Sequence, residues 1–174
     1  MKRIAIVGVG NRLMGDDGFG SYMAEALYGN VKGCDVIDLG AAGASAMEVL
    51  KDYDIIILID AVAMDKDFDI SRMDINIDSD EVTSTVLDFE YSGSHGVGIQ
   101  SILTTLKIMG YVPEVYLVGC KPYVLDVKLG LSEQLRRKLD QIVLSLADFL
   151  KKNFGIEVTV DDTIKKLYGV VNNN

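Results

Sequence analysis

Asp17, Asp60 and His95 are of residue types that bind divalent metal ions, and they stand out among the residues of these types by their sequence context. Asp60 ends the apolar run DIIILID, and a carboxylate at the lip of a buried strand is costly unless it is paired, hydrogen-bonded or bound to a cation. His95 is the only histidine, and its context GSHGVG leaves the imidazole accessible. Two carboxylates and one imidazole suit a transition metal and leave coordination positions open for chemistry.

Each of these residues also has a structural interpretation. Asp16 and Asp17 both precede a predicted helix, and Asp16 could cap it by accepting a backbone N–H bond. One cap does not require two acids, so Asp17 stays free to contact a cation. Asp60 could bond to neighbouring loop amides, and a lone histidine is more often structural than a ligand. Ser94 offers no convincing nucleophile, because residues adjacent in sequence, such as Ser94 and His95, rarely face each other.

The stretch GVGNRLMGDDGFG could also be read as a dinucleotide-binding loop, which requires G-x-G-x-x-G directly after a strand. Gly8 and Gly10 supply the first two glycines, but Leu13 occupies the third position, so the close helix–strand packing expected there is not provided. Asp38 could meet a ribose hydroxyl. The two adjacent acids, however, stand where a pyrophosphate would sit and would repel it. The loop therefore favours a cation over a nucleotide.

The elements that must position these residues alternate between apolar runs and helix-like segments. This alternation predicts an α/β fold, a three-layer α/β/α sandwich with a mostly parallel twisted sheet flanked by helices. In such folds sites form beyond the carboxyl ends of the strands, where the loops bearing Asp17, Asp60 and His95 are expected to meet. The expected strands are 4–9, 34–39, 54–60, 70–77 and 115–119, and the expected helices are 19–28, 44–52, 97–109 and 132–154, with Gly155 as the C-terminal cap of the last.

The chain length of 174 residues fits one domain. We expect residues 1–155 to form this domain and residues 156–174 to be a C-terminal extension of unknown role. Residues 156–160 are interpreted as either a late edge strand or a loop, and residues 170–174 as a loose tail. A dimer contact, a docking element and a loose tail remain open for the extension as a whole.

Composition narrows the class of protein. No apolar run reaches the ~18 residues of a membrane span, and the N-terminus lacks a secretory signal, so a cytoplasmic location is expected. Cys34 and Cys120 form no CxxC pair and are predicted to be reduced core residues. The net charge of −9 argues against nucleic acid as a partner. Residues 61–95 hold nine acidic against two basic residues, either as a solvated connection or as a rim for a basic partner segment.

The stretch GVGNRLMGDDGFG, residues 8–20, resembles the N-terminal signature of the nickel–iron hydrogenase maturation endopeptidases, G-x-G-N-x-L-x-x-D-(D/E)-G-x-G. The resemblance continues through DLGAAG at 38–43, LIDAV around Asp60, SHGVG around His95 and VYLVGCKP at 115–122, and covers roughly residues 3–150. Two positions depart from the family pattern: Arg12 stands where a proline or apolar residue is common, and Asp17 where glutamate is frequent. The signature matches at Gly8, Gly10, Asn11, Leu13, Asp16, Asp17, Gly18 and Gly20.

The resemblance implies an endopeptidase that removes the C-terminal extension of a nickel–iron hydrogenase large-subunit precursor after nickel insertion. It implies that the nickel is supplied by the precursor and serves as the recognition element. Carried over to this chain, Asp17, Asp60 and His95 are the metal-contacting and catalytic residues. Asp38, Gly40 and Gly43 are expected at the substrate, and Asp16 acts as a helix cap or an assisting acid.

Two alternatives to this function remain: a nucleotide-dependent oxidoreductase and a non-catalytic, metal-sensing chaperone of hydrogenase assembly. The expected partner is the large-subunit precursor, with no nucleic acid and no membrane insertion. The protein itself is expected to be a monomer or a weak homodimer.

Overall fold

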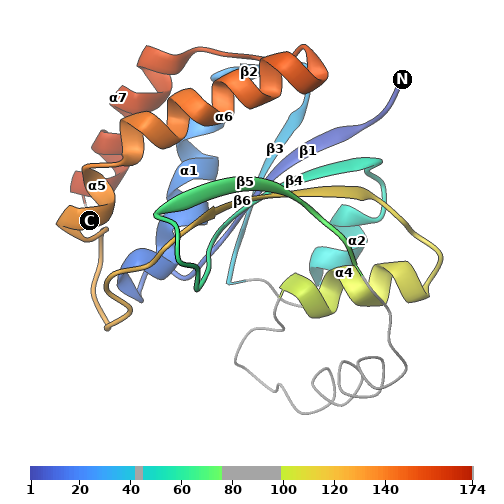
Figure 1. Ribbon diagram of the computed structural model, residues 1–174, viewed down its shortest axis with the longest axis horizontal. Helices are drawn as coiled ribbons and strands as arrows, with labels where there is room; N and C mark the ends of the chain where they lie inside the picture. The colour runs from blue at the N-terminus through green and yellow to red at the C-terminus, as the bar shows by residue number, and fades with distance from the viewer. Residues whose placement is uncertain (42–44, 76–98, 174) are drawn as a thin grey trace.

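The computed structural model in Figure 1 describes residues 1–41, 45–75 and 99–173. Its centre is a five-stranded sheet of order β3-β1-β4-β6-β5. The first four strands run parallel, and β5 runs antiparallel to β6 at one edge, which confirms the mostly parallel sheet expected from the sequence. The strands are β1 (Ile4–Val9), β3 (Asp35–Gly40), β4 (Ile55–Ala61), β5 (Phe68–Met73) and β6 (Glu114–Cys120).

Helices cover both faces of this sheet (Figure 1). Because side chains alternate along a strand, β4 divides its apolar residues between two cores. Ile57 and Ile59 pack with α1 (Phe19–Leu27) and α6 (Leu139–Phe154) on one face. Ile56 and Leu58 pack with α2 (Ser45–Leu50) and α4 (Ile99–Ile108) on the other. The three-layer α/β/α sandwich predicted from the sequence is confirmed.

The parallel register gathers the carboxyl ends of the strands at one edge. Gly8 in β1 pairs with Asp38 in β3 on one side and with Ile59 in β4 on the other. Asp60, the next residue of β4, pairs with Gly119 near the end of β6. The segments that leave β1, β3 and β4 therefore emerge side by side, which is the arrangement a site at this edge requires.

The expected long helix over 132–154 is interrupted. It consists of a short helix α5 (Glu133–Arg136) and the long helix α6, which begins at Leu139. The Ser132 hydroxyl accepts a hydrogen bond from the Leu135 N–H at 3.2 Å and thereby caps α5. Gly155 ends α6 in a left-handed conformation with φ +67°, and the C-terminal cap predicted there is confirmed.

The C-terminal tail is helical, so the prediction of a loose end at 170–174 is wrong through residue 172. Helix α7 (Val160–Asn172) buries Leu167 and Val171 in the same apolar core as α1 and α6. Burying these side chains supplies the free energy that orders the segment. Figure 1 shows α7 beside α6 on the α1 side of the sheet.

Short strands near the C-terminus do not extend the main sheet. Strand β7 (Glu157–Val158) pairs antiparallel with β2 (Val31–Lys32) in a separate two-stranded sheet, so the late strand exists but is not an edge of the central sheet. Strand β5 begins two residues before the expected start at Ile70 and ends at Met73, so the expected continuation is wrong at residues 74 and 75; the expected end at Ile77 lies outside the described residues. Within the described ranges, no helix is long and apolar enough to cross a bilayer.

Candidate functional site

The loop after β1 turns sharply and carries both acids on a 3-10 helix, η1 (Gly15–Gly18), before α1 begins. A side chain at Gly10 is excluded, because a Cβ there would lie 1.9 Å from the Asp17 carbonyl oxygen. The loop therefore folds back on itself, and Gly10 packs against the backbone of Asp17.

Helix α1 packs directly against the strands through two glycines. A Cβ on Gly8 would lie 2.1 Å from the Gly20 carbonyl oxygen, and a Cβ on Gly20 would lie 2.1 Å from the Ile59 oxygen and 2.2 Å from the Val9 oxygen. Leu13 is exposed and does not provide close helix–strand packing, as expected from the sequence, but such packing exists farther along the chain. Gly20, seven residues later, provides it, and its place in the signature was the available signal.

Asp16 is fully buried and accepts four hydrogen bonds from the segment that follows β6. Its donors are the backbone N–H groups of Tyr123 (2.8 Å), Val124 (3.0 Å) and Ser132 (2.7 Å), together with the Ser132 hydroxyl (2.7 Å). No side chain caps the N-terminus of α1 at Gly18, so the helix-cap interpretation of Asp16 is corrected. The carboxylate instead ties η1 to the segment leading into α5.

Asp17 and Asp60 form the acidic pair at the carboxyl edge of the sheet. Asp17 is half-buried, and its Oδ2 accepts a hydrogen bond from the Asn11 N–H at 2.9 Å. Burial, the larger cause, and the negative charge of Asp17 together raise the pKa of Asp60 to about 7, while a hydrogen bond from the Ala61 backbone opposes the shift. The structural interpretation of Asp60 expected bonds from loop amides; the donor is instead Ala61, the last residue of β4, and its bond does not offset the burial.

The third expected metal contact, His95, lies outside the described residues, as does Gly43. In the parts of the chain that the structure describes, no group of three or more His, Cys, Asp or Glu side chains is arranged to hold a metal ion. Two of the three residues, Asp17 and Asp60, are therefore brought together, and the role of His95 stays a prediction.

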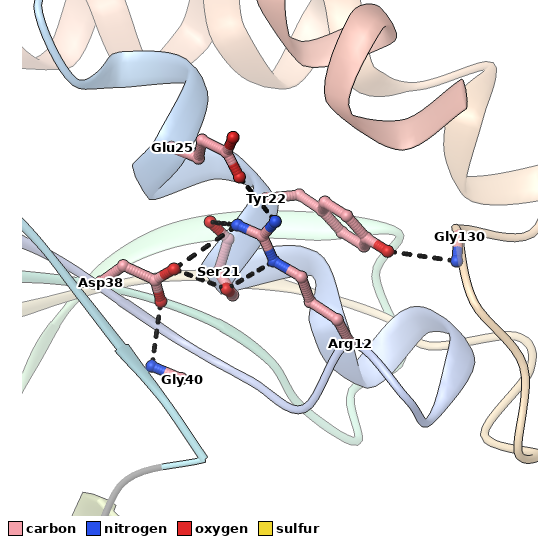
Figure 2. Close-up of polar contacts among 7 residues, drawn as sticks. All are labelled: Arg12, Ser21, Tyr22, Glu25, Asp38, Gly40 and Gly130. Carbon is pink, nitrogen blue, oxygen red and sulfur yellow. Dashed lines mark hydrogen bonds and ion pairs between the residues drawn. The ribbon is translucent and has the colours of Figure 1, made fainter. Parts of the chain in front are cut away.

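Asp38 anchors a turn at the end of β3 (Figure 2). Its Oδ1 accepts a hydrogen bond from the Gly40 N–H at 2.9 Å, and Gly40 adopts φ +55°, a conformation that favours glycine. The Gly40 carbonyl in turn accepts a hydrogen bond from the Gly10 N–H at 2.8 Å. The Asp38 turn is thus joined to the loop that carries Asp17.

Arg12 and Ser21 also bind Asp38, and neither was assigned a role from the sequence. The Ser21 hydroxyl donates to Asp38 Oδ2 at 2.7 Å, and the Arg12 guanidinium lies 3.4 Å from the same oxygen. Arg12 was visible in the sequence only as a departure from the family pattern, and Ser21 had no signal because it lies inside an ordinary amphipathic helix.

Neither cysteine is suited to act as a nucleophile. Both thiols are free: Cys120 is buried and Cys34 is half-buried, as predicted for reduced residues. Burial, and to a lesser extent the charge of Asp35, raises the pKa of Cys34 to about 11. Burial also raises the pKa of Cys120, with the charges of Asp16 and Asp60 adding to the effect. The reactive thiolate is therefore disfavoured at both positions.

Comparison with known proteins gives one consistent family. The family model for hydrogenase maturation proteases matches residues 22–148. A Methanocaldococcus jannaschii protein assigned as a hydrogenase maturation protease is 36% identical over 87% of this chain and 98% of its own length.

Two solved structures agree with this match. The hydrogenase-maturating endopeptidase HybD of Escherichia coli superposes with a TM-score of 0.67 at 25% identity, covering 89% of this chain and 95% of HybD. A hydrogenase 2 maturation peptidase from a Thaumarchaeota archaeon superposes with a TM-score of 0.57 at 30% identity, covering 88% of this chain and 99% of that one. The chain therefore belongs to the hydrogenase maturation protease family, whose members are endopeptidases.

Proposed function

We propose that this protease removes the C-terminal extension of a nickel–iron hydrogenase large-subunit precursor once nickel has been inserted, and that it recognises the nickel that the precursor holds. The observation that carries the proposal is the convergence of Asp17 and Asp60 at the carboxyl edge of the sheet, in a chain of this family. A folded precursor that presents its own metal needs a site with anionic ligands and open coordination positions.

The electrostatics of the pair suit a cation that arrives with the substrate. Asp60 is costly to ionise in the free protein because it is half-buried and lies near a second negative charge. A divalent ion between the carboxylates would remove both penalties at once, since opposite charge favours the ionised form. Precursor without nickel would gain no such contact, and the site would discriminate against it.

The residues then take separate roles. Asp17 and Asp60, with His95 as the third ligand, would contact the precursor's nickel and position the scissile bond, whose carbonyl or attacking water the metal would polarise as a Lewis acid. Asp38, Gly40 and Gly43 would lie along the substrate. An assisting acid role for Asp16 is disfavoured, because its carboxylate is fully buried and is already bound by four donors.

The remaining parts of the proposal concern the setting. We place the reaction in the cytoplasm, with the precursor as the protein partner and without nucleic acid. The protease would act as a monomer or a weak homodimer.

Incubation of the purified protein with full-length precursor, with and without inserted nickel, tests the proposal. We expect intact-mass analysis to show the loss of one C-terminal peptide from the nickel-loaded precursor alone. Binding without a mass change would support a metal-sensing chaperone, and saturable NAD(P) binding would support the nucleotide-dependent oxidoreductase. His95→Ala is expected to abolish cleavage at unchanged thermal stability, and full activity in that variant would remove His95 from the site.

A further inference from the structure

Arg12, in the loop that carries Asp17, is bound by three residues of α1 and by Asp38 (Figure 2). Its Nε donates to the Ser21 hydroxyl at 2.8 Å, and one terminal nitrogen donates to the Ser21 carbonyl at 3.0 Å and approaches Asp38 Oδ2 at 3.4 Å. The other terminal nitrogen pairs with Glu25 at 2.5 Å. The guanidinium carbon lies 4.5 Å from the centre of the Tyr22 ring.

The partners of Arg12 are themselves held in place. Ser21 is almost fully buried on α1. The Tyr22 ring is fully buried, and its hydroxyl accepts a hydrogen bond from the Gly130 N–H at 3.1 Å. The Arg12 side chain is 28% exposed, so its ion pairs are partly shielded from water. These contacts fix the guanidinium in one orientation. Ser21, Tyr22 and Glu25 all belong to α1, whereas Asp38 belongs to strand β3.

Three consecutive residues join the Asp38 turn to Asp17. The Gly10 N–H bonds to the Gly40 carbonyl, the Asn11 N–H bonds to the Asp17 carboxylate, and the Arg12 guanidinium reaches Asp38. The contact with Asp17 is thus made by Asn11, which lies between the two residues that contact the Asp38 turn.

The Asp38 side chain remains accessible despite these bonds. It is 38% exposed and lines a groove of about 370 Å³. Glu25, the other acid paired with Arg12, lines the same groove. Arg12 pairs with both carboxylates, and among the residues that line the groove Lys166 is a further cation.

We propose that Arg12 is a positioning residue for substrate binding: its guanidinium holds the Asp38 carboxylate in one orientation relative to the loop that bears Asp17. The proposal rests on the proposed function, because it takes Asp38 as a contact to the precursor. It also gives a role to Arg12, one of the two positions at which this sequence departs from the family pattern. Arginine is required because its planar fork binds Ser21 and Asp38 while its face stacks on Tyr22, which the ammonium of lysine cannot do.

Cleavage kinetics with the nickel-loaded precursor test this proposal. Arg12→Leu is expected to raise KM about tenfold, the effect of losing a hydrogen bond to a charged group, while kcat changes less than about twofold. In an Asp38→Asn background the same substitution should change KM by less than about twofold, because Arg12 acts through Asp38. Arg12→Lys should not restore the wild-type KM. Arg137→Leu, which removes an exposed arginine paired with Glu133, is the matched control and should leave KM unchanged.

Hydrogen exchange at the Gly40 amide provides a readout that does not depend on activity. This amide donates to Asp38, so it should exchange faster in Arg12→Leu and stay protected in Arg137→Leu. If Arg12→Leu does not fold, Ser21→Ala removes the hydroxyl that bridges Arg12 and Asp38 and should raise KM in the same direction.

The outcomes separate the two proposals. A wild-type protein that cleaves no precursor overturns the proposed function, while the Gly40 exchange still decides the positioning role. A cleaving wild type together with an unchanged KM in Arg12→Leu, effects of Arg12→Leu and Asp38→Asn that simply add, or unaltered Gly40 exchange would each overturn the role of Arg12.

Discussion

Asp17 and Asp60 come from different elements, η1 and the end of β4, and the charge of Asp17 adds to burial in raising the pKa of Asp60 to about 7. Near neutral pH the Asp60 carboxyl of the free protein is therefore close to half-protonated. A cation that binds between the two carboxylates would displace that proton, because its positive charge favours the ionised form of Asp60.

The first prediction concerns stability against pH. Because the folded-state pKa of Asp60 is raised from 3.8 to about 7, the folded protein keeps a proton that the unfolded chain has lost between these values. The free energy of unfolding therefore falls as pH rises through this window and levels off above it. Asp60→Asn should remove this loss and be more stable than wild type by about 2–4 kcal/mol at pH 8, with little difference near pH 4.

Urea unfolding at several pH values measures this effect. Asp148→Asn, which alters an exposed acid paired with Lys152, is the matched control and should follow the wild-type curve. Parallel pH profiles for wild type and Asp60→Asn would contradict the assignment.

A second prediction separates the two causes of the Asp60 shift. Asp17→Asn removes the neighbouring charge but leaves the burial, so the pKa of Asp60 should fall and remain above its ordinary value of 3.8. Carboxyl-carbon NMR titration follows the group directly. Asp148→Asn, which alters an exposed acid paired with Lys152, serves as control and should leave the Asp60 titration unchanged. An Asp60 titration that is the same in Asp17→Asn as in wild type would mean that the two carboxylates do not interact.

Asp16 carries the third prediction. Asp16→Ala would leave three backbone N–H groups and the Ser132 hydroxyl without their acceptor in a fully buried place. The expected loss of unfolding free energy is about 3–5 kcal/mol, as for breaking other buried charged networks. Asp148→Ala, on the exposed face of α6, should cost less than about 0.5 kcal/mol. A loss below about 1 kcal/mol in Asp16→Ala would show that water replaces the carboxylate.

The central sheet was predictable because its strands are short apolar runs bounded by polar residues. Strand β4, IIILIDA, is buried on both faces over its first five residues, and such a run has few alternatives to a central parallel strand. The position of Asp60 followed from the same pattern, since the strand ends where the apolar run ends. Its proximity to Asp17 followed from the rule that parallel strands place their carboxyl ends together.

Side-chain partners that lie far apart in sequence were not predictable. The donors to Asp16 lie more than 100 residues away, in a segment without periodicity, so only the local cap seemed available. Helix α7 has an apolar stripe, but whether a terminal stripe is buried depends on the surface that α1 and α6 leave for it. Arg12 could be singled out as unusual, yet its contact with Asp38 exists only once β3 lies beside β1.

The last prediction concerns the close contact between α1 and the sheet. Gly20→Ala would place a methyl group 2.1–2.2 Å from the carbonyl oxygens of Ile59 and Val9, and backbone atoms cannot move aside as a flexible side chain can. Helix α1 would have to move away from β1 and β4, which should cost about 3 kcal/mol or more. Gly169→Ala in α7 is the matched control, because a Cβ there meets nothing within 4 Å and alanine should stabilise the helix by about 0.5–1 kcal/mol. Urea unfolding of both variants measures the difference. Since η1 leads directly into α1, the displacement of α1 in Gly20→Ala should also move Asp17 and slow cleavage. Equal stability of Gly20→Ala and Gly169→Ala would contradict the close packing.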